Sequence, residues 1–371
     1  MRRAIAAVIV LAACNSPNLE SVDEIGFPDV LASDLQSILD SELESVNAPG
    51  ATVTVVLPDG LEWSGATGYA SLEPERVAVP QDRFRIGSVT KTFVAAISIQ
   101  LAEEGVWSLD DSIDAWVPGF DLGPEVTLRR LLSHTAGLFD FTGDPDFIAQ
   151  SITGPSDIVA FALAHDMVGA PGQHYKYSNT GFILMGMAIE NALGRTLHAV
   201  IRERLLEPYD LQDTYLEGQE TLEGGHVSGY VVGVEDTIVY PEFDMNWAWA
   251  AGAMVSNGAD QCQWARVLVQ PTQEMKPPVS EASRTEMQTP QPTTDDGPAP
   301  YGLGLMLYHR AGRAVIGHTG STMGFKGEVF IDAATGACVA IQTNDFASEP
   351  GSLRDALWHR LGTWLEQPVA K

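Results

Sequence analysis

A serine and a lysine stand three residues apart at Ser88 and Lys91, within residues 85–94. On a helix this spacing places both side chains on one face. A serine hydroxyl becomes a nucleophile when a base takes its proton, and a lysine can be that base if burial or a nearby cation lowers its pKa. Gly87 and an apolar-periodic run predict that Ser88 begins a helix, at the positive end of its dipole. By itself, however, Ser-x-x-Lys favours a helix cap followed by a surface lysine.

A second group with possible chemistry is Tyr177-Ser178-Asn179, at the start of a predicted helix over residues 179–193. A tyrosine there can exchange a proton with a serine or with a leaving group. An asparagine can hold a lysine or a substrate amide. Without the other groups, the pattern equally fits a helix cap at Ser178 with a buried tyrosine before it.

A third group is His318-Thr319-Gly320, followed by Ser321, at the end of a predicted β-strand. A glycine there lets a substrate approach the backbone, and an edge strand can pair with an extended ligand. The backbone N–H groups of Ser88 and Ser321 are candidates for an oxyanion hole. The plain alternative is a strand end with a satisfied histidine.

The elements that must position these groups predict an α+β fold. Helical periodicity runs from residue 28 to about 46 and from 351 to about 365. Helical signals also dominate between residues 84 and 287. The predicted strands are 51–57, 61–69, 313–319, 324–332 and 337–343. We therefore expect a five-stranded antiparallel sheet, flanked by N- and C-terminal helices, with a mostly helical region inserted between strands.

These elements define one expected domain over residues 28–367. Its sheet part is 28–83 and 300–367, and its helical part is 84–299. The chain has 371 residues, of which 45% are hydrophobic and 19% charged, as in a globular protein with a substantial core. The net charge of -28 argues against nucleic acid as a partner and against binding anionic lipid through a basic patch. We interpret the acidity as a solubility feature.

The N-terminus has the pattern of an export signal. Two arginines precede a short apolar run, and small residues follow, so we expect a signal peptide over residues 1–13. Residues 11–14 resemble a bacterial lipoprotein cleavage box, which predicts lipidation of Cys14 and a flexible tether over residues 14–27. The alternative is an ordinary signal peptide with a stray cysteine. Either way we expect an exported protein, periplasmic or membrane-anchored as a lipoprotein, otherwise secreted, whose only membrane contact is a lipid anchor at Cys14.

The other two cysteines are Cys262, in a predicted helix, and Cys338, in a predicted strand. They are able to pair in an oxidising compartment, but their places favour two buried thiols. The chain has no Cys-x-x-Cys, no His-Glu-x-x-His and no other zinc-site spacing. We expect neither a metal nor a cofactor.

Ser-x-x-Lys, Tyr-Ser-Asn and His-Thr-Gly, in this order, resemble the motifs of the penicillin-recognising serine hydrolases. The resemblance is to the branch of class C β-lactamases and serine D-alanyl-D-alanine carboxypeptidases, and it covers roughly residues 30 to 365. Each motif is weak alone, but three in order are specific. Further matching stretches are residues 84–93, 131–138, 171–186, 301–305 and 317–325.

The resemblance implies that Ser88 is the acylated nucleophile and Lys91 its general base. Tyr177 would shuttle protons in deacylation and to the leaving group, and which of Lys91 and Tyr177 takes the first proton is left open. The implied substrate-binding residues are Asn179, His318, Thr319 and Gly320, and the implied oxyanion hole is the backbone N–H groups of Ser88 and Ser321. His134, in the stretch 131–138, is expected to be structural.

The chain departs from the class C pattern at His318, where those β-lactamases usually carry lysine. Histidine there is more like the carboxypeptidase and esterase relatives, and it is mostly neutral near pH 7, so it holds a carboxylate less firmly. A carboxypeptidase would need an arginine for the terminal carboxylate. Arg310 and Arg313 are near in sequence, but no motif fixes either one.

The function expected first is therefore a monomeric serine hydrolase that acts through an acyl-enzyme, most like a D-alanyl-D-alanine carboxypeptidase. The alternatives with the same fold are a class C-like β-lactamase and a hydrolase of small esters or D-amino-acid peptides. A further alternative is an inactive homologue that binds penicillin or peptidoglycan. Such a protein should carry a damaged motif, whereas all three motifs are intact in this chain. An α/β-hydrolase is excluded, because the chain has no Gly-x-Ser-x-Gly elbow.

Overall fold

The computed structural model describes residues 26–149, 154–221, 223–232, 237–240, 244–297 and 300–367. The predicted signal peptide over 1–13, Cys14 and nearly all of the tether over 14–27 lie outside the described residues. No helix among the described residues combines the length and the apolar character that crossing a membrane requires.

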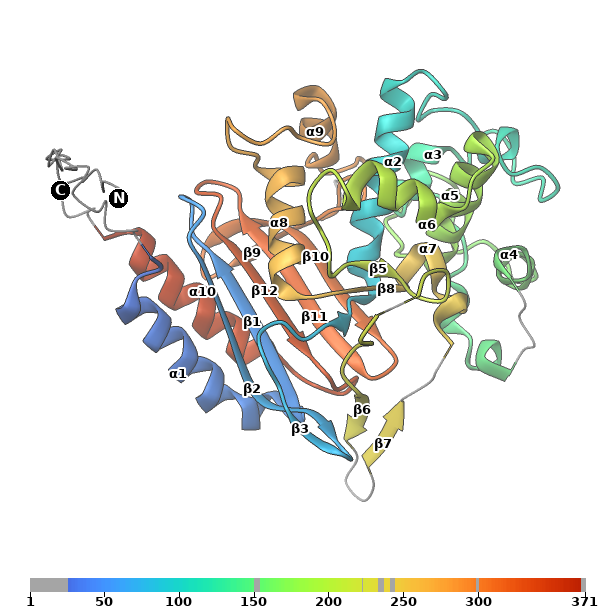
Figure 1. Cartoon of the computed structure of the whole chain (residues 1–371). Helices are drawn as coiled ribbons and strands as arrows, with labels where there is room; N and C mark the ends of the chain where they lie inside the picture. The colour runs from blue at the N-terminus through green and yellow to red at the C-terminus, as the bar shows by residue number, and fades with distance from the viewer. Residues whose placement is uncertain are drawn as a thin grey trace, which may run out of the picture.

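The centre of the fold is an antiparallel sheet of seven strands in the order β3-β2-β1-β12-β11-β10-β9 (Figure 1). The strands are β1 (Gly50–Val56), β2 (Glu62–Leu72), β3 (Glu75–Val77), β9 (Met306–Arg310), β10 (Arg313–Thr322), β11 (Phe325–Asp332) and β12 (Cys338–Thr343). The α+β class is confirmed, and the five predicted strands form the middle of the sheet.

The prediction of five strands is wrong, because the sheet gains an edge strand on each side. β3 has three residues, all exposed, and β9 has five, of which only Met306 is buried. Edge strands are short and solvated, so they lack the buried alternation that marks a strand in a sequence.

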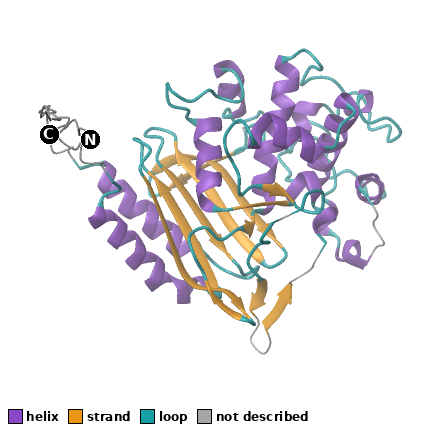
Figure 2. Ribbon diagram, viewed as in Figure 1, coloured by secondary structure: helices purple, strands orange, loops and turns teal. Residues whose placement is uncertain are grey.

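Two helices cover one face of the sheet, α1 (Asp29–Val46) and α10 (Gly351–Leu365), as Figures 1 and 2 show. Leucines recur every four residues on both helices, so one stripe of each is apolar and faces the sheet. These buried leucines are Leu31, Leu35 and Leu39 on α1, and Leu353, Leu357 and Leu361 on α10.

The other face carries α8 (Gly258–Val269) and the helical region (Figure 2). The remaining helices are α2 (Thr90–Glu103), α3 (Leu128–Leu132), α4 (Pro155–Leu163), α5 (Asn179–Leu193), α6 (Leu197–Ile201) with a π-helical turn (Arg202–Leu206), α7 (Trp249–Gly252) and α9 (Glu281–Met287). Short 3₁₀ turns are Gly87–Val89, Ile113–Ala115, Phe141–Gly143, Pro145–Ala149 and Met245–Trp247. Smaller sheets are formed by β4 (Phe84–Arg85), β8 (Met254–Ser256) and β5 (Tyr215–Leu216), and by β6 (Gly229–Val232) and β7 (Thr237–Tyr240).

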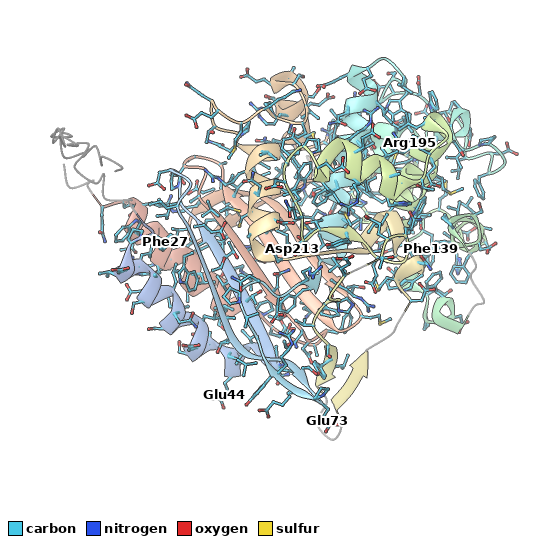
Figure 3. The ribbon with its side chains drawn as sticks, viewed as in Figure 1. Phe27, Glu44, Glu73, Phe139, Arg195 and Asp213 are labelled. Atoms are coloured by element: carbon cyan, nitrogen blue, oxygen red, sulfur yellow. The ribbon has the colours of Figure 1, made fainter. Side chains whose placement is uncertain are left out.

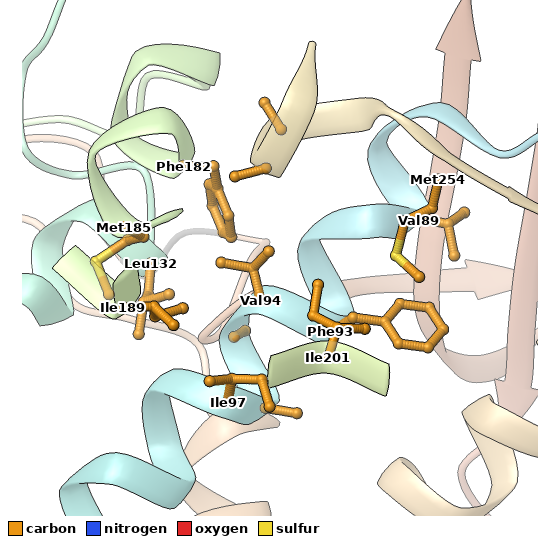
Figure 4. Packing of buried hydrophobic residues seen from close by; sticks show 14 of the residues in the cluster. Val89, Phe93, Val94, Ile97, Leu132, Phe182, Met185, Ile189, Ile201 and Met254 are labelled. Atoms are coloured by element: carbon orange, nitrogen blue, oxygen red, sulfur yellow. The ribbon is translucent and has the colours of Figure 1, made fainter. Parts of the chain in front are cut away.

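Helix α2 is the centre of the helical region. It is buried on nearly every side, in keeping with a sequence that is apolar all round. Figure 4 shows its side chains Phe93, Val94 and Ile97 packed among residues from α3, α5, α6 and β8. The helix that carries Lys91 is therefore fixed in place by packing against α3, α5, α6 and β8.

Cys262 on α8 and Cys338 on β12 are buried free thiols, which confirms the expectation for this pair.

The contact of α8 with α2 predicts a stability effect. Trp264 on α8 is buried, donates a 2.8 Å hydrogen bond to the Thr92 hydroxyl and stacks on Phe93 with ring centroids 4.4 Å apart. We expect Trp264→Ala to lower the free energy of unfolding by about 3–5 kcal/mol in urea titrations, and Trp264→Phe by about 1–2 kcal/mol.

The control is Trp364 on α10, which is half-buried with Arg360 over its ring at 5.7 Å. Trp364→Ala should cost about 1 kcal/mol. Equal losses for the two alanine variants would contradict the central place given to the α2–α8 contact.

Candidate active site

The chain reaches Ser88 through β4 and a 3₁₀ turn, Gly87–Val89, that leads into α2. Gly87 has φ +50°, in the left-handed region that favours glycine, and a Cβ there would lie 2.7 Å from the Ser321 backbone nitrogen. A Cβ on Gly320 would lie 1.9 Å from the Ile86 carbonyl oxygen and 3.5 Å from the Ser88 nitrogen. The two glycines thus allow β10 to pack closely against the Ser88 turn. The backbone nitrogens of Ser88 and Ser321 both lie at this contact.

Lys91 lies one helical turn after Ser88 and is fully buried. Its Nζ donates hydrogen bonds to Ser88 Oγ at 2.9 Å, to Asn179 Oδ1 at 2.7 Å and to the Ala251 carbonyl at 2.6 Å. Each ammonium proton therefore has an acceptor. The surface lysine of the plain alternative is excluded.

Burial lowers the pKa of Lys91 from 10.5 to about 7, and the negative charge of Asp140 partly opposes this change. Lys91 therefore changes its protonation state near neutral pH, where an ordinary lysine stays charged. A neutral Nζ at 2.9 Å is placed to accept the Ser88 proton. The pair has the geometry and the proton affinity of a nucleophile with its base.

Tyr177 lies beside Lys91 and Ser88. Lys91 Nζ lies 4.9 Å from the centroid of its ring, and its hydroxyl is buried near the Ser88 side chain. Burial raises the pKa of Tyr177 far above its ordinary value, and the nearby Ser88 side chain offsets this only in part. The phenol keeps its proton at neutral pH, so Lys91 is the better base and Tyr177 the better proton donor.

Asn179 begins α5 and is held by Asp140, a residue that the sequence does not single out. Asn179 Nδ2 donates to Asp140 Oδ1 at 3.2 Å and to Thr142 Oγ1 at 3.1 Å, while its Oδ1 faces Lys91. The carbonyl of Phe139, labelled in Figure 3, accepts the Ser178 and Thr180 hydroxyls and so anchors the same helix start. Asp140 lies two residues beyond the stretch 131–138, which is its only signal in the sequence.

His318 lies behind the site rather than in its opening. It is fully buried, with Nδ1 2.5 Å from the Thr319 carbonyl and Nε2 2.9 Å from the Tyr301 hydroxyl. Facing a carbonyl, Nδ1 must carry the proton, and Nε2 then accepts the tyrosine O–H. Burial, helped by the charge of Lys91, lowers the pKa of His318 to about 3, so the ring is neutral. Both ring nitrogens are taken within the protein.

The strand that carries His318 is longer than predicted. β10 does not end at Thr319 but continues to Thr322, where a tight turn leads into β11. β9 pairs with β10 only as far as Gly317, so the edge of β10 from His318 onward has no paired strand among the described residues. Thr319 is half-buried, with its hydroxyl 3.5 Å from the Met306 sulfur, and Ser321 is exposed. The open edge borders the Ser88 turn, where an extended substrate can pair with it.

His134 has the contacts of a structural residue. It is buried, its Nδ1 accepts the Ser178 backbone N–H at 3.2 Å, and its ring centroid lies 4.0 Å from that of Tyr177. Burial is the main reason that the pKa of His134 lies well below its ordinary value. The neutral ring supports Tyr177 from behind.

Arg310 and Arg313 do not reach the site. Arg313 forms ion pairs with Asp332 at 2.7 Å and with Glu366, the residue that follows α10, at 3.0 Å. Arg310 lies over the rings of Tyr308 and Phe330. Both therefore lie on the sheet face that α10 covers. Within the described ranges, no group of three or more His, Cys, Asp or Glu side chains is arranged to hold a metal ion.

The close approach at Gly320 predicts a loss of reactivity. In Gly320→Ala the new methyl would strike the Ile86 carbonyl, push the Ser88 turn away from β10 and separate the backbone nitrogens of Ser88 and Ser321. We expect the rate at which a fluorophosphonate labels Ser88, followed by intact mass, to fall about a hundredfold. The control is Gly351→Ala on α10, where the nearest atom is 3.5 Å away. A parental rate in Gly320→Ala would show that this contact is unimportant.

The pKa of Lys91 predicts the pH profile of the same reaction. Because only the neutral amine accepts a proton, the labelling rate should fall about tenfold for each pH unit below about 7 and level off above it. Lys91→Arg, which stays protonated, should lose labelling throughout this range. Near-parental labelling of Lys91→Ala would remove the lysine from the role of base.

Solved structures of known proteins have a fold similar to that of this chain. The D-amino acid amidase of Ochrobactrum anthropi SV3, solved with L-phenylalanine amide, superposes with a TM-score of 0.80 and 27% identity, over 91% of this chain and all of the amidase. A D-stereospecific amidohydrolase from Streptomyces sp. superposes with a TM-score of 0.77 and 28% identity, over 89% of this chain and 99% of that one.

Among curated proteins, the unguisins hydrolase ungD' of Aspergillus campestris is 27% identical over 340 residues, which cover 85% of this chain and 62% of that protein. The chain spans about half the length of the first curated relatives that it matches. The model of the Beta-lactamase family matches residues 35–362. With this match over most of its length, the chain belongs to the Beta-lactamase family.

Proposed function

We propose that this protein hydrolyses amide bonds of D-amino-acid amides or peptides through an acyl-enzyme on Ser88. The observation that carries the proposal is the hydrogen bond between Ser88 Oγ and the buried Lys91, whose pKa of about 7 makes it a base near neutral pH. The amidases named above are similar in fold and sequence, and the unguisins hydrolase is similar in sequence; both support the choice of a hydrolase and, for the amidases, of a D-amino-acid amide substrate.

The proposed reaction has two stages. Neutral Lys91 Nζ takes the Ser88 proton as Oγ attacks the substrate carbonyl, and the backbone N–H groups of Ser88 and Ser321 stabilise the oxyanion. The C–N bond then breaks, with the amine leaving as it receives a proton from the Tyr177 hydroxyl, which Lys91 reprotonates. Water next attacks the ester on Ser88 and gives up a proton to the same groups, which pass it to Ser88 Oγ as the C–O bond breaks and the acid leaves.

The charges around the site favour an uncharged leaving group. A carboxypeptidase must hold the terminal carboxylate of its substrate, usually with a cation. Here His318 is neutral and buried, and Arg310 and Arg313 lie on the other face of the sheet. Lys91 already has three acceptors. These contacts support an amide or an internal peptide bond over a D-alanyl-D-alanine terminus, the substrate expected first from the sequence.

We further propose, from the sequence alone, that the protein acts outside the cytoplasm. Residues 1–13 and Cys14 have the pattern of an exported lipoprotein, so the substrate would be met outside the cytoplasmic membrane.

A substrate panel tests the proposed function. D-phenylalanine amide, L-phenylalanine amide, a D-alanyl-D-alanine peptide, nitrocefin and p-nitrophenyl acetate would be assayed side by side. We expect the highest kcat/KM for the D-amide, at least about tenfold above the L-amide, because one pocket contact is worth about that much.

Ser88→Ala should abolish turnover, whereas Ser37→Ala, the same change at an exposed position of α1, should leave turnover intact. Intact mass after incubation with a fluorescent penicillin would report acylation independently. Faster release of D-alanine from the peptide than of ammonia from the amide would favour the carboxypeptidase instead. Turnover that persists in Ser88→Ala would refute the assigned nucleophile.

A further inference from the structure

We infer that Asp140 is a positioning residue for Lys91. It fixes the orientation of the Asn179 amide, and through this amide and through its own negative charge it determines how well Lys91 accepts a proton. The inference rests on the proposed role of Lys91 but not on the identity of the substrate.

Asp140 is saturated by contacts at the start of α5. Its Oδ1 accepts the backbone N–H groups of Thr142 at 3.3 Å and Asn179 at 3.2 Å, and Asn179 Nδ2 at 3.2 Å. Its Oδ2 accepts the Thr142 hydroxyl at 3.0 Å and Asn179 Nδ2 at 3.3 Å. With both oxygens engaged, this carboxylate is built to hold neighbouring groups rather than a substrate.

These contacts decide which way the Asn179 amide points. The carboxylate and the Thr142 hydroxyl both draw Nδ2 toward themselves, so Oδ1 faces Lys91 Nζ at 2.7 Å. A reversed amide would place two donors against the lysine and an oxygen against the carboxylate. Asp140 thereby excludes the orientation in which Lys91 loses one of its three acceptors.

The same carboxylate also acts on Lys91 through its negative charge. The groups that face Lys91 from the surrounding elements are Ser88, Asn179, the Ala251 carbonyl, Tyr177, His134, His318 and, beyond Asn179, Asp140. Tyr177 keeps its proton, and burial lowers the pKa of both histidines so that they are neutral. Asp140 is thus the charge that partly opposes the effect of burial and keeps the pKa of Lys91 from falling further.

Titration of Lys91 tests this without any substrate. The chain has five lysines, so the Nζ and Cε signals of lysine-labelled protein can be followed by NMR and assigned with Lys91→Ala. In Asp140→Asn the charge is lost and burial acts unopposed, so the pKa of Lys91 should fall by about one unit. In Asp140→Glu the charge remains, so the pKa should stay near the parental value.

Asp144→Asn is the matched control. It removes a carboxylate four residues away that binds His165 at 2.8 Å and not Asn179. The pKa of Lys91 should be parental in this variant. An unchanged pKa in Asp140→Asn, or an equal fall in Asp144→Asn or in Asp140→Glu, would overturn the electrostatic part of the inference.

The positioning part is read from the plateau rate of Ser88 labelling by a fluorophosphonate above about pH 8, where Lys91 is neutral in every variant. We expect a fall of between about tenfold and a hundredfold in Asp140→Asn and in Asp140→Glu, since misplaced groups cost rates of this order. A parental plateau in both would overturn it. If the parent itself is not labelled on Ser88, the proposed function fails, while the titration still decides the role of Asp140.

Discussion

The burial of one lysine is the constraint on which the rest of this structure depends. Lys91 is taken out of water on a helix that is itself buried on nearly all sides, and its Nζ is enclosed by three acceptors from three different segments. Removing a charge from water is costly, and in proteins the usual response is a lowered pKa. The fold therefore holds a latent base, and Ser88, Asn179 and the backbone at Ala251 must lie where that base needs them.

Much of this arrangement is predictable because its elements carry strong local signals. The buried middle strands, the apolar stripes of α1 and α10 and the glycine before Ser88 each follow from side-chain pattern and backbone sterics. Strands β3 and β9 escape prediction because they are short edges whose pairing, not their pattern, makes them strands. The site residues Ser88, Lys91, Tyr177 and Asn179 come together as their order implies, since each stands at the start of a helix or directly beside one.

The parts that are not predictable depend on contacts between distant segments. The sequence cannot show that His318 donates to the Thr319 carbonyl and accepts from the Tyr301 hydroxyl, because these contacts depend on how β10 packs against Tyr301. It equally cannot say that Asp140, an acidic residue among 49, is the one beneath Asn179. In both cases a side chain of ordinary type acquires its role from burial and from a partner far away in the chain.

The open edge of β10 beyond Gly317 has a consequence for handedness. A backbone that pairs with this edge has its peptide planes fixed by the strand, so the mirror-image configuration at one α-carbon exchanges the directions of the side chain and the α-hydrogen. Chiral selection at such a site needs no dedicated recognition group, because the choice between enantiomers becomes a choice between two directions for one side chain.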